Sequence, residues 1–137
     1  MQEPVLDLTI VLQDQVDNEE LDRLTRQMRN EIAELDVEMV KLAQGEALPS
    51  GAKGDPITIG TIVVALASAG VFTALIELLK SWALRREGRT ITLKVRDGER
   101  EMELAYSPAD TSPEEMARFV DKVIGVLQQG KRSTAKR

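Results

Sequence analysis

The sequence predicts an α+β domain with a β-α-β unit, a long apolar helix, a β-hairpin and a C-terminal helix. Three observations lead to this prediction. Aliphatic residues alternate near the start of the chain, apolar residues recur every three to four positions in later segments, and Asp97-Gly98 is typical of a two-residue hairpin turn. A chain of 137 residues can bury one core, so we expect a single domain over residues 1–130 and a disordered basic tail over residues 131–137.

The first forty residues predict a strand, a helix and a second strand. Aliphatic residues share one face of residues 5–12, which is typical of a strand. Asp17 or Asn18 can cap the helix that follows, because their side chains accept hydrogen bonds from the first backbone N–H groups. The second strand is expected over residues 35–42. Its inward-facing side chains are expected to be Leu35, Val37 and Met39.

Residues 56–76 carry no charge, although 30% of the chain is charged. Asp55-Pro56 is typical of a helix start, so we expect a helix over residues 56–86. The β-branched residues between positions 57 and 66 favour a strand instead, which would give a strand plus a helix in a ferredoxin-like order. The patch Ala67-Ser68-Ala69-Gly70 would then mark the turn between them, or else a bend or break of the helix. The sequence leaves helix and strand open at residues 57–66.

The charge-free segment must be shielded from water, either by protein or by lipid. Its length is about that of a helix crossing a bilayer. The basic Arg85-Arg86 pair would then fix the orientation so that the N-terminal unit is exported, although no signal sequence is visible. We therefore expect protein to bury the segment, with membrane insertion of residues 56–84 by a membrane effector as the alternative. The expected apolar interface consists of Val63, Leu66, Phe72, Leu75 and Leu79.

The last third of the chain predicts a hairpin and a helix. Residues 90–95 and 99–104 flank the turn, and the predicted register places Leu93 opposite Met102. Ser112-Pro113-Glu114-Glu115 is a capping box with proline at the first helical position. An apolar stripe follows and is expected to end before Gly130. The stripe consists of Met116, Phe119, Val120, Val123, Ile124 and Leu127.

Composition argues against most enzyme classes. The chain has no cysteine and no histidine, so it lacks a thiolate nucleophile and the commonest general base near neutral pH. The glycines around Lys53 do not have the spacing of a phosphate-binding P-loop. A net charge of −5 argues against a nucleic-acid partner. We expect no enzymatic activity, no metal and no cofactor, and a cytoplasmic location, since no secretory signal is visible.

Several stretches taken together resemble a known family. The chain is similar to the effector-associated constant component proteins of bacterial NTP-dependent conflict systems, and the resemblance covers residues 35–127. It rests on a loop, a small-residue apolar segment, a tryptophan and a hairpin in this order. The stretches are Gly51-Ala52-Lys53-Gly54-Asp55-Pro56-Ile57-Thr58-Ile59-Gly60, Ala67-Ser68-Ala69-Gly70, Leu79-Lys80-Ser81-Trp82-Ala83-Leu84-Arg85-Arg86 and Gly88-Arg89-Thr90-Ile91-Thr92-Leu93.

The resemblance implies a non-enzymatic adaptor in defence against phage or other invasive elements. Such proteins occur with varied effectors, among them caspase-like and trypsin-like peptidases, and often with NTPase components. The implied partners are an effector protein, an NTPase sensor or both. We also expect a homo-oligomer, with membrane association as the alternative. The positions that match the family pattern and can contact a partner are Lys53, Trp82, Arg85 and Arg86, of which Trp82 also fits simple core packing.

Overall fold

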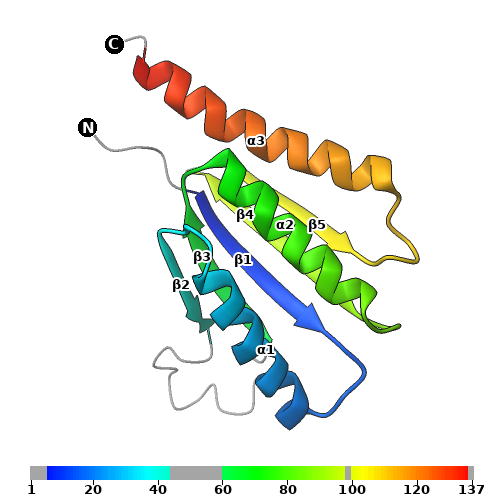
Figure 1. Ribbon diagram of the computed structural model, residues 1–137. Helices are drawn as coiled ribbons and strands as arrows, with labels where there is room; N and C mark the ends of the chain where they lie inside the picture. Colours follow the sequence, from blue (N-terminus) through cyan, green and yellow to red (C-terminus); the bar gives the residue numbers. More distant parts are fainter. Residues whose placement is uncertain (1–5, 44–59, 98–99, 136–137) are drawn as a thin grey trace.

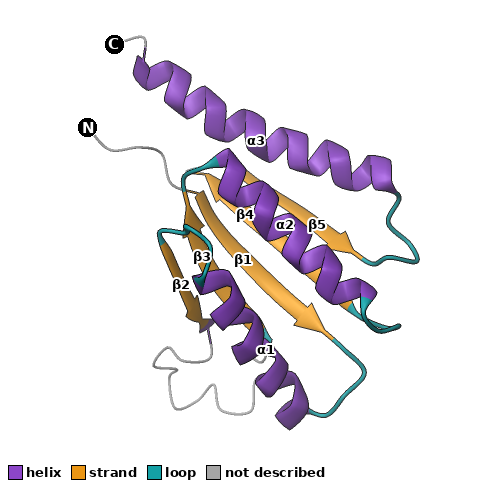
Figure 2. Ribbon diagram, viewed as in Figure 1, coloured by secondary structure: helices purple, strands orange, loops and turns teal. Residues whose placement is uncertain are grey.

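The computed structural model describes residues 6–43, 60–97 and 100–135 (Figure 1). Within these residues, five strands form one antiparallel sheet in the order β2-β3-β1-β4-β5, and three helices accompany it (Figure 2). The predicted α+β class is confirmed. The elements are β1 (Leu6–Gln13), α1 (Asn18–Ala33), β2 (Met39–Leu42), β3 (Thr61–Leu66), α2 (Ala69–Leu84), β4 (Thr90–Asp97), β5 (Arg100–Tyr106) and α3 (Pro113–Ala135).

The sheet is built from two interlocked β-α-β units. Strand β3 pairs antiparallel with both β1 and β2, so β1 and β2 run parallel with β3 between them and α1 as their connection. In the same way, β1 pairs antiparallel with β3 and β4, which run parallel and are joined by α2. This is the ferredoxin-like order that a strand at residues 57–66 would give, with β5 added beside β4.

The continuous helix expected over residues 56–86 is wrong. Residues 56–59 lie outside the described part of the chain, β3 occupies Thr61–Leu66, and α2 begins at Ala69 after its N-cap Ser68. Strand β3 lies inside the sheet between β2 and β1, and its β-branched Ile62 and Val64 are fully buried on the core face. Among the described residues, no helix is both long and apolar enough to cross a membrane. In its described part, the segment expected to insert, residues 56–84, is divided between β3 and α2.

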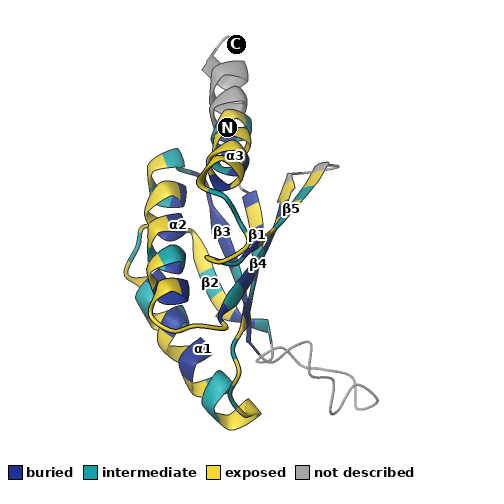
Figure 3. Cartoon of the chain, turned by 90° about the vertical axis from the view of Figure 1, so that its right-hand side faces the viewer, coloured by how far each residue is buried: buried dark blue, intermediate teal, exposed yellow. Residues whose placement is uncertain are grey.

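Alternate residues of each strand face the helices and form the core. Leu8 of β1 lies between Val64 of β3 and Val95 of β4, and all three are at most 1% exposed. Figure 3 shows that α1 and α2 turn their buried sides toward this face of the sheet. The helices supply the other half of the apolar layer. Their fully buried side chains include Met28, Ile32, Phe72, Leu75, Leu79 and Val123.

The second strand is shorter than expected. It begins at Met39, and its core-facing residues are Val40 and Leu42. Leu35 and Val37 still pack against the core, but from the segment that precedes the strand. The predicted inward position of Met39 is wrong, because its side chain is 37% exposed. Successive side chains of a strand point to opposite faces of the sheet. Because Val40 faces the core, the neighbouring Met39 lies on the other face.

The hairpin of β4 and β5 forms in a register shifted by two residues. Leu93 lies opposite Leu104 rather than opposite Met102, which pairs with Val95. Because side chains alternate with a period of two, this shift keeps the apolar pairs on the core face and the charged pairs on the other face. The pair that flanks the loop is Asp97 with Arg100, and the loop residues 98–99 lie outside the described part of the chain.

Helix α3 begins as predicted and ends later. The backbone N–H of Glu115 donates to Ser112 Oγ at 3.1 Å, and the N–H of Ser112 donates to Glu115 Oε1 at 3.2 Å, which confirms the capping box. The helix continues past Gly130 to Ala135, beyond the apolar stripe that was expected to end before this glycine. A glycine inside a helix costs only about 1 kcal/mol relative to alanine, so it does not stop a helix by itself.

Candidate functional site

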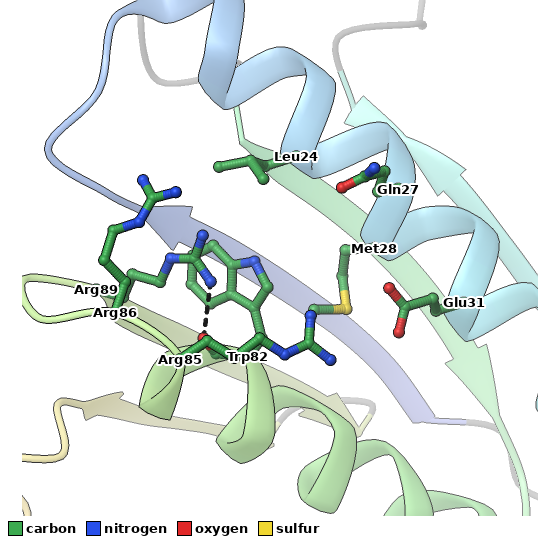
Figure 4. A pocket seen from close by; sticks show the side chains of 8 residues that line it. All are labelled: Leu24, Gln27, Met28, Glu31, Trp82, Arg85, Arg86 and Arg89. Atoms are coloured by element: carbon green, nitrogen blue, oxygen red, sulfur yellow. Dashed lines mark hydrogen bonds between the residues drawn. The ribbon is translucent and has the colours of Figure 1, made fainter.

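Three of the four predicted contact residues meet at the C-terminal end of α2. Trp82, Arg85 and Arg86 line a hollow of about 190 Å³ between α1 and α2, together with Arg89 (Figure 4). The fourth, Lys53, lies outside the described residues. The wall on the side of α1 consists of Leu24, Gln27, Met28 and Glu31.

Trp82 and Arg89 form the buried floor of this end of α2. Trp82 is 3% exposed, and the guanidinium of Arg89 lies over its ring, 4.2 Å from the centroid. Arg89 Nη1 also donates a hydrogen bond to the Trp82 carbonyl at 2.9 Å. This carbonyl belongs to the last turn of α2, where helical donors run out. Arg89 therefore caps the helix and packs on the indole at the same time.

Asp14 ties the same end of α2 to the end of β1. Its side chain has no exposed surface, and its Oδ2 accepts hydrogen bonds from Arg89 Nε at 2.8 Å and from Arg86 Nη1 at 3.2 Å. The two arginines differ in exposure: the side chain of Arg89 is 5% exposed and that of Arg86 is 48% exposed. Arg89 is therefore the buried partner of Asp14, and Arg86 is a second partner at the surface.

A glycine makes this arrangement possible. The chain turns between α2 and β4 at Gly88, whose φ is +90°, a conformation that residues with a Cβ rarely adopt. A Cβ at this position would also lie 3.1 Å from the side chain of Gln15. Because the turn is this tight, Arg89 follows α2 closely enough to reach back to the Trp82 carbonyl.

Arg85 differs from its neighbours because it has no ion pair within the described residues. Its side chain is exposed and points toward Glu31 of α1 across the hollow (Figure 4). The two groups are further apart than an ion pair allows. Arg85 therefore presents free guanidinium donors at the entrance of the hollow.

Leu84 stands on the other side of the same helix end. It is 65% exposed, more than any other large apolar side chain in the described residues. It lies between a hollow of about 530 Å³, which also contains Arg86 and Pro108, and a groove of about 390 Å³ between α2 and α3. We call Leu84, Arg85 and Arg86, with the three hollows around them, the α2-end surface.

The predicted apolar interface residues lie elsewhere in the structure. Leu66, Phe72, Leu75 and Leu79 are each at most 2% exposed and belong to the protein's own core. Val63 is partly buried on the opposite face of the sheet. On α2, apolar and basic side chains thus emerge together at the C-terminal end.

The α2-end surface combines basic, acidic and apolar side chains. In the hollow between α1 and α2, three arginines outnumber the carboxylates of Asp14 and Glu31, which leaves local positive charge there on a chain of net charge −5. The other two hollows also contain Glu77, Lys80, Glu87 and Asp121, so the excess of positive charge is confined to the first hollow. Guanidinium groups bind carboxylates and phosphates through paired hydrogen bonds. The described residues contain no group of three or more carboxylates that could hold a metal ion.

Sequence reasoning missed three members of this site. Asp14 and Arg89 carry no local sign of burial, because their burial follows from a contact between positions 75 residues apart. Leu84 gives no local signal either, because α2 is apolar on most of its surface and the exposed position cannot be told from the buried ones.

Comparison with known proteins gives one match. A family model described as Effector Associated Constant Component 1 matches residues 10–124. The matched range runs from β1 into α3 and includes the whole α2-end surface. It also begins earlier than residue 35, where the resemblance in the sequence begins. No curated protein and no solved structure matches the chain.

Proposed function

The chain belongs to the Effector Associated Constant Component 1 family, whose members are effector-associated components of conflict systems, and from this premise we propose that it is a non-enzymatic adaptor. In this proposal it links a sensor or an NTPase to an effector such as a caspase-like or trypsin-like peptidase. It acts through protein–protein contacts in the cytoplasm of a bacterial cell, without a cofactor or a nucleic-acid partner.

The observation that carries this proposal is the α2-end surface. Leu84 is 65% exposed between two hollows, and the neighbouring Arg85 is unpaired in the described part of the chain. Interfaces place apolar anchors in pockets and enrich arginine around them. This combination supports binding of a protein rather than of a small molecule, because the hollows are spread around a helix end instead of forming one enclosed cavity.

The absence of enzymatic activity in this proposal rests on the sequence. Acyl transfer and hydrolysis near neutral pH commonly use histidine or cysteine, and the chain has neither. The buried charges of the α2-end surface have structural partners, since Asp14 and Arg89 bind each other and Arg89 also binds the end of α2. In this proposal, any enzymatic reaction is therefore catalysed by the effector.

Co-expression tests the adaptor role. We would express the full chain with each protein encoded by the neighbouring genes of its source organism, purify it through a tag, and measure the mass of each complex by light scattering. We expect a defined complex with an effector or an NTPase, and the mass of the chain alone reports self-association. We expect Leu84→Glu to weaken the complex, because it places a charge on the apolar anchor.

The matched control is Arg96→Glu, a change at an exposed arginine of β4 whose partner is Glu101. We expect this variant to bind like the wild type. The absence of any complex with the neighbouring proteins, or hydrolysis of a peptide or nucleotide by the purified chain alone, would overturn the proposal.

A further inference from the structure

We propose that the α2-end surface binds an acidic-apolar segment of the partner protein, in which a carboxylate is held by Arg85 and Arg86 and an adjacent apolar side chain packs against Leu84. This inference rests on the proposed function and specifies the chemistry of its partner. It follows from three properties of the surface: an arginine that can be released, an arginine that is unpaired, and an exposed leucine beside a hollow.

Arg86 can leave Asp14 without harm to the fold. The side chain of Asp14 has no exposed surface, so its carboxylate needs a cationic partner, and a buried carboxylate left alone would be strongly destabilising. Arg89 meets this need by itself, because its Nε donates to Asp14 at 2.8 Å and its guanidinium is held over Trp82. Arg86 adds a longer hydrogen bond of 3.2 Å from a half-exposed position. A carboxylate from a partner can therefore recruit Arg86 while Asp14 stays neutralised.

Arg85 supplies the second cation. It lines the same hollow of about 190 Å³ as Arg86 and has no ion pair in the described part of the chain. Glu31 on the opposite wall disfavours a carboxylate close to α1, so the partner's carboxylate is expected on the side of the hollow nearer to α2. Two arginines around one carboxylate give the paired hydrogen bonds that make such contacts strong.

Leu84 makes a protein segment the expected occupant, rather than a free anion. Arg86 lines both the hollow between α1 and α2 and the neighbouring hollow that contains Leu84. A segment whose carboxylate contacts Arg86 can thus continue into the second hollow, where the exposed Leu84, Pro108 and Ala109 offer apolar contacts. A free phosphate would use the arginines but would gain nothing from Leu84.

Peptide selection tests this chemistry without knowledge of the partner. We would select random short peptides displayed on phage against the immobilised full chain, with removal of peptides that bind the Arg85→Glu/Arg86→Glu double variant. We expect the enriched peptides to carry Asp or Glu beside Leu, Ile, Met or Phe. A synthetic peptide of the best sequence should bind the double variant about tenfold more weakly or worse, and Leu84→Ser about fivefold more weakly.

Charge reversal sharpens the test. The same peptide with lysine in place of its acidic residue should bind the double variant better than the wild type, and Arg96→Glu should bind the original peptide normally. Circular dichroism and the fluorescence of Trp82, the single tryptophan of the chain, verify that each variant is folded. Selection of peptides without a carboxylate, equal binding by the double variant, or no enrichment at all would overturn the inference. A second copy of this chain as occupant would also overturn it, and would show as a concentration-dependent mass lost in the double variant.

The two proposals fail in different ways. A complex with an encoded effector that survives the double variant would overturn the acidic-apolar segment and leave the adaptor role standing. Successful peptide selection without any complex among the encoded neighbours would leave the binding chemistry standing and overturn the adaptor role.

Discussion

Helices α1 and α2 hold equivalent places in the two interlocked β-α-β units, and each has 16 residues. Their compositions nevertheless differ. Helix α1 is amphipathic, and its exposed side carries the ion pairs of Arg23 with Glu20 and of Arg26 with Asp22. Its buried residues are Leu24, Thr25, Met28 and Ile32. Helix α2 buries more of its surface, with Phe72, Leu75, Ile76, Leu79, Trp82 and Ala83.

The difference follows from the number of neighbours. Helix α2 lies between α1 and α3 and also packs on the sheet, whereas α1 lies at the side of the helical layer (Figure 1). A helix surrounded by protein is apolar on most of its circumference, just as a membrane helix is. The comparison shows that a charge-free segment can reflect a central position in a small domain. It also indicates that a partner-binding site is best sought at the end of such a helix, where the neighbouring helices and the sheet no longer cover it.

The largest expected effect is on the free energy of unfolding, when one core residue of each helix is replaced by alanine. Phe72→Ala in α2 should lower the free energy of unfolding by about 3–5 kcal/mol, because a fully buried ring leaves a large cavity. Leu24→Ala in α1 should cost about 2 kcal/mol, since Leu24 is smaller and lies near the surface. Urea unfolding followed by circular dichroism measures both. A larger loss for Leu24→Ala would break the distinction between a central and a peripheral helix.

The next effect concerns the two arginines that share Asp14. Arg89→Ala removes the buried partner and the cover of Trp82, so it should cost about 3 kcal/mol. Arg86→Ala removes a half-exposed partner and should cost less than about 1 kcal/mol. Thermal or urea unfolding of both variants separates the structural arginine from the arginine that is free to bind a partner. Equal costs would contradict the separate roles.

A smaller effect is expected at the helix N-caps. Asp17 accepts from the Glu20 N–H at 2.8 Å, and Ser68 accepts from the Val71 N–H at 3.3 Å. Asp17→Ala should therefore cost about 1 kcal/mol and Ser68→Ala about 0.5 kcal/mol. Urea unfolding of the two variants gives the comparison. A higher cost for Ser68→Ala would mean that α2 depends on its cap more than on its packing.

The smallest effect appears in acid. The hydrogen bond from Arg23 holds the pKa of Glu20 below its usual value, with a further contribution from the charges of Arg23 and Arg86. Because the folded pKa is below the unfolded one, the stabilisation is present above the unfolded pKa of about 4.3 and is lost as pH falls through the folded pKa. Glu20→Gln should thus be slightly less stable than the wild type at neutral pH, and the difference should close in this acidic range. A difference independent of pH would exclude this ion pair as its source. Helix α2 has no acidic residue in its first turn.

Local patterns predicted most elements of the fold. The alternation in β1, the Asp17 cap of α1 and the capping box of α3 are signals within a few residues, and the structure contains all three. The pairing of β4 with β5 was predicted incorrectly, because a shift of two residues satisfies the same alternation. The start and the inward face of β2 were also predicted incorrectly, because Leu35 and Val37 pack against the core from outside the strand, while Val40 and Leu42 face the core within it. At residues 57–66 the local signals disagreed, and in the described part of this range pairing with β1 and β2 makes Thr61–Leu66 a strand.

The candidate site was predicted in part. The resemblance to the family pointed to Trp82, Arg85 and Arg86, and the structure brings all three to one end of α2. Sequence reasoning could not separate their roles, since burial of Trp82 and exposure of Arg85 depend on elements far away in the chain. The same reason hid Asp14, whose importance arises only when the end of β1 meets the turn before β4.

The sequence by itself determined the α+β class, the hairpin, the capped helices and the family, because these depend on residue order over short distances. The tertiary structure alone decided that residues 61–66 form an inner strand and that α2 is covered on several sides. It also decided that Arg86 and Arg89 share the buried carboxylate of Asp14. These features depend on contacts between distant segments, where burial strengthens electrostatic interactions and fixes which apolar side chains are covered. The same packing leaves the C-terminal end of α2 exposed, because the neighbouring elements do not cover it.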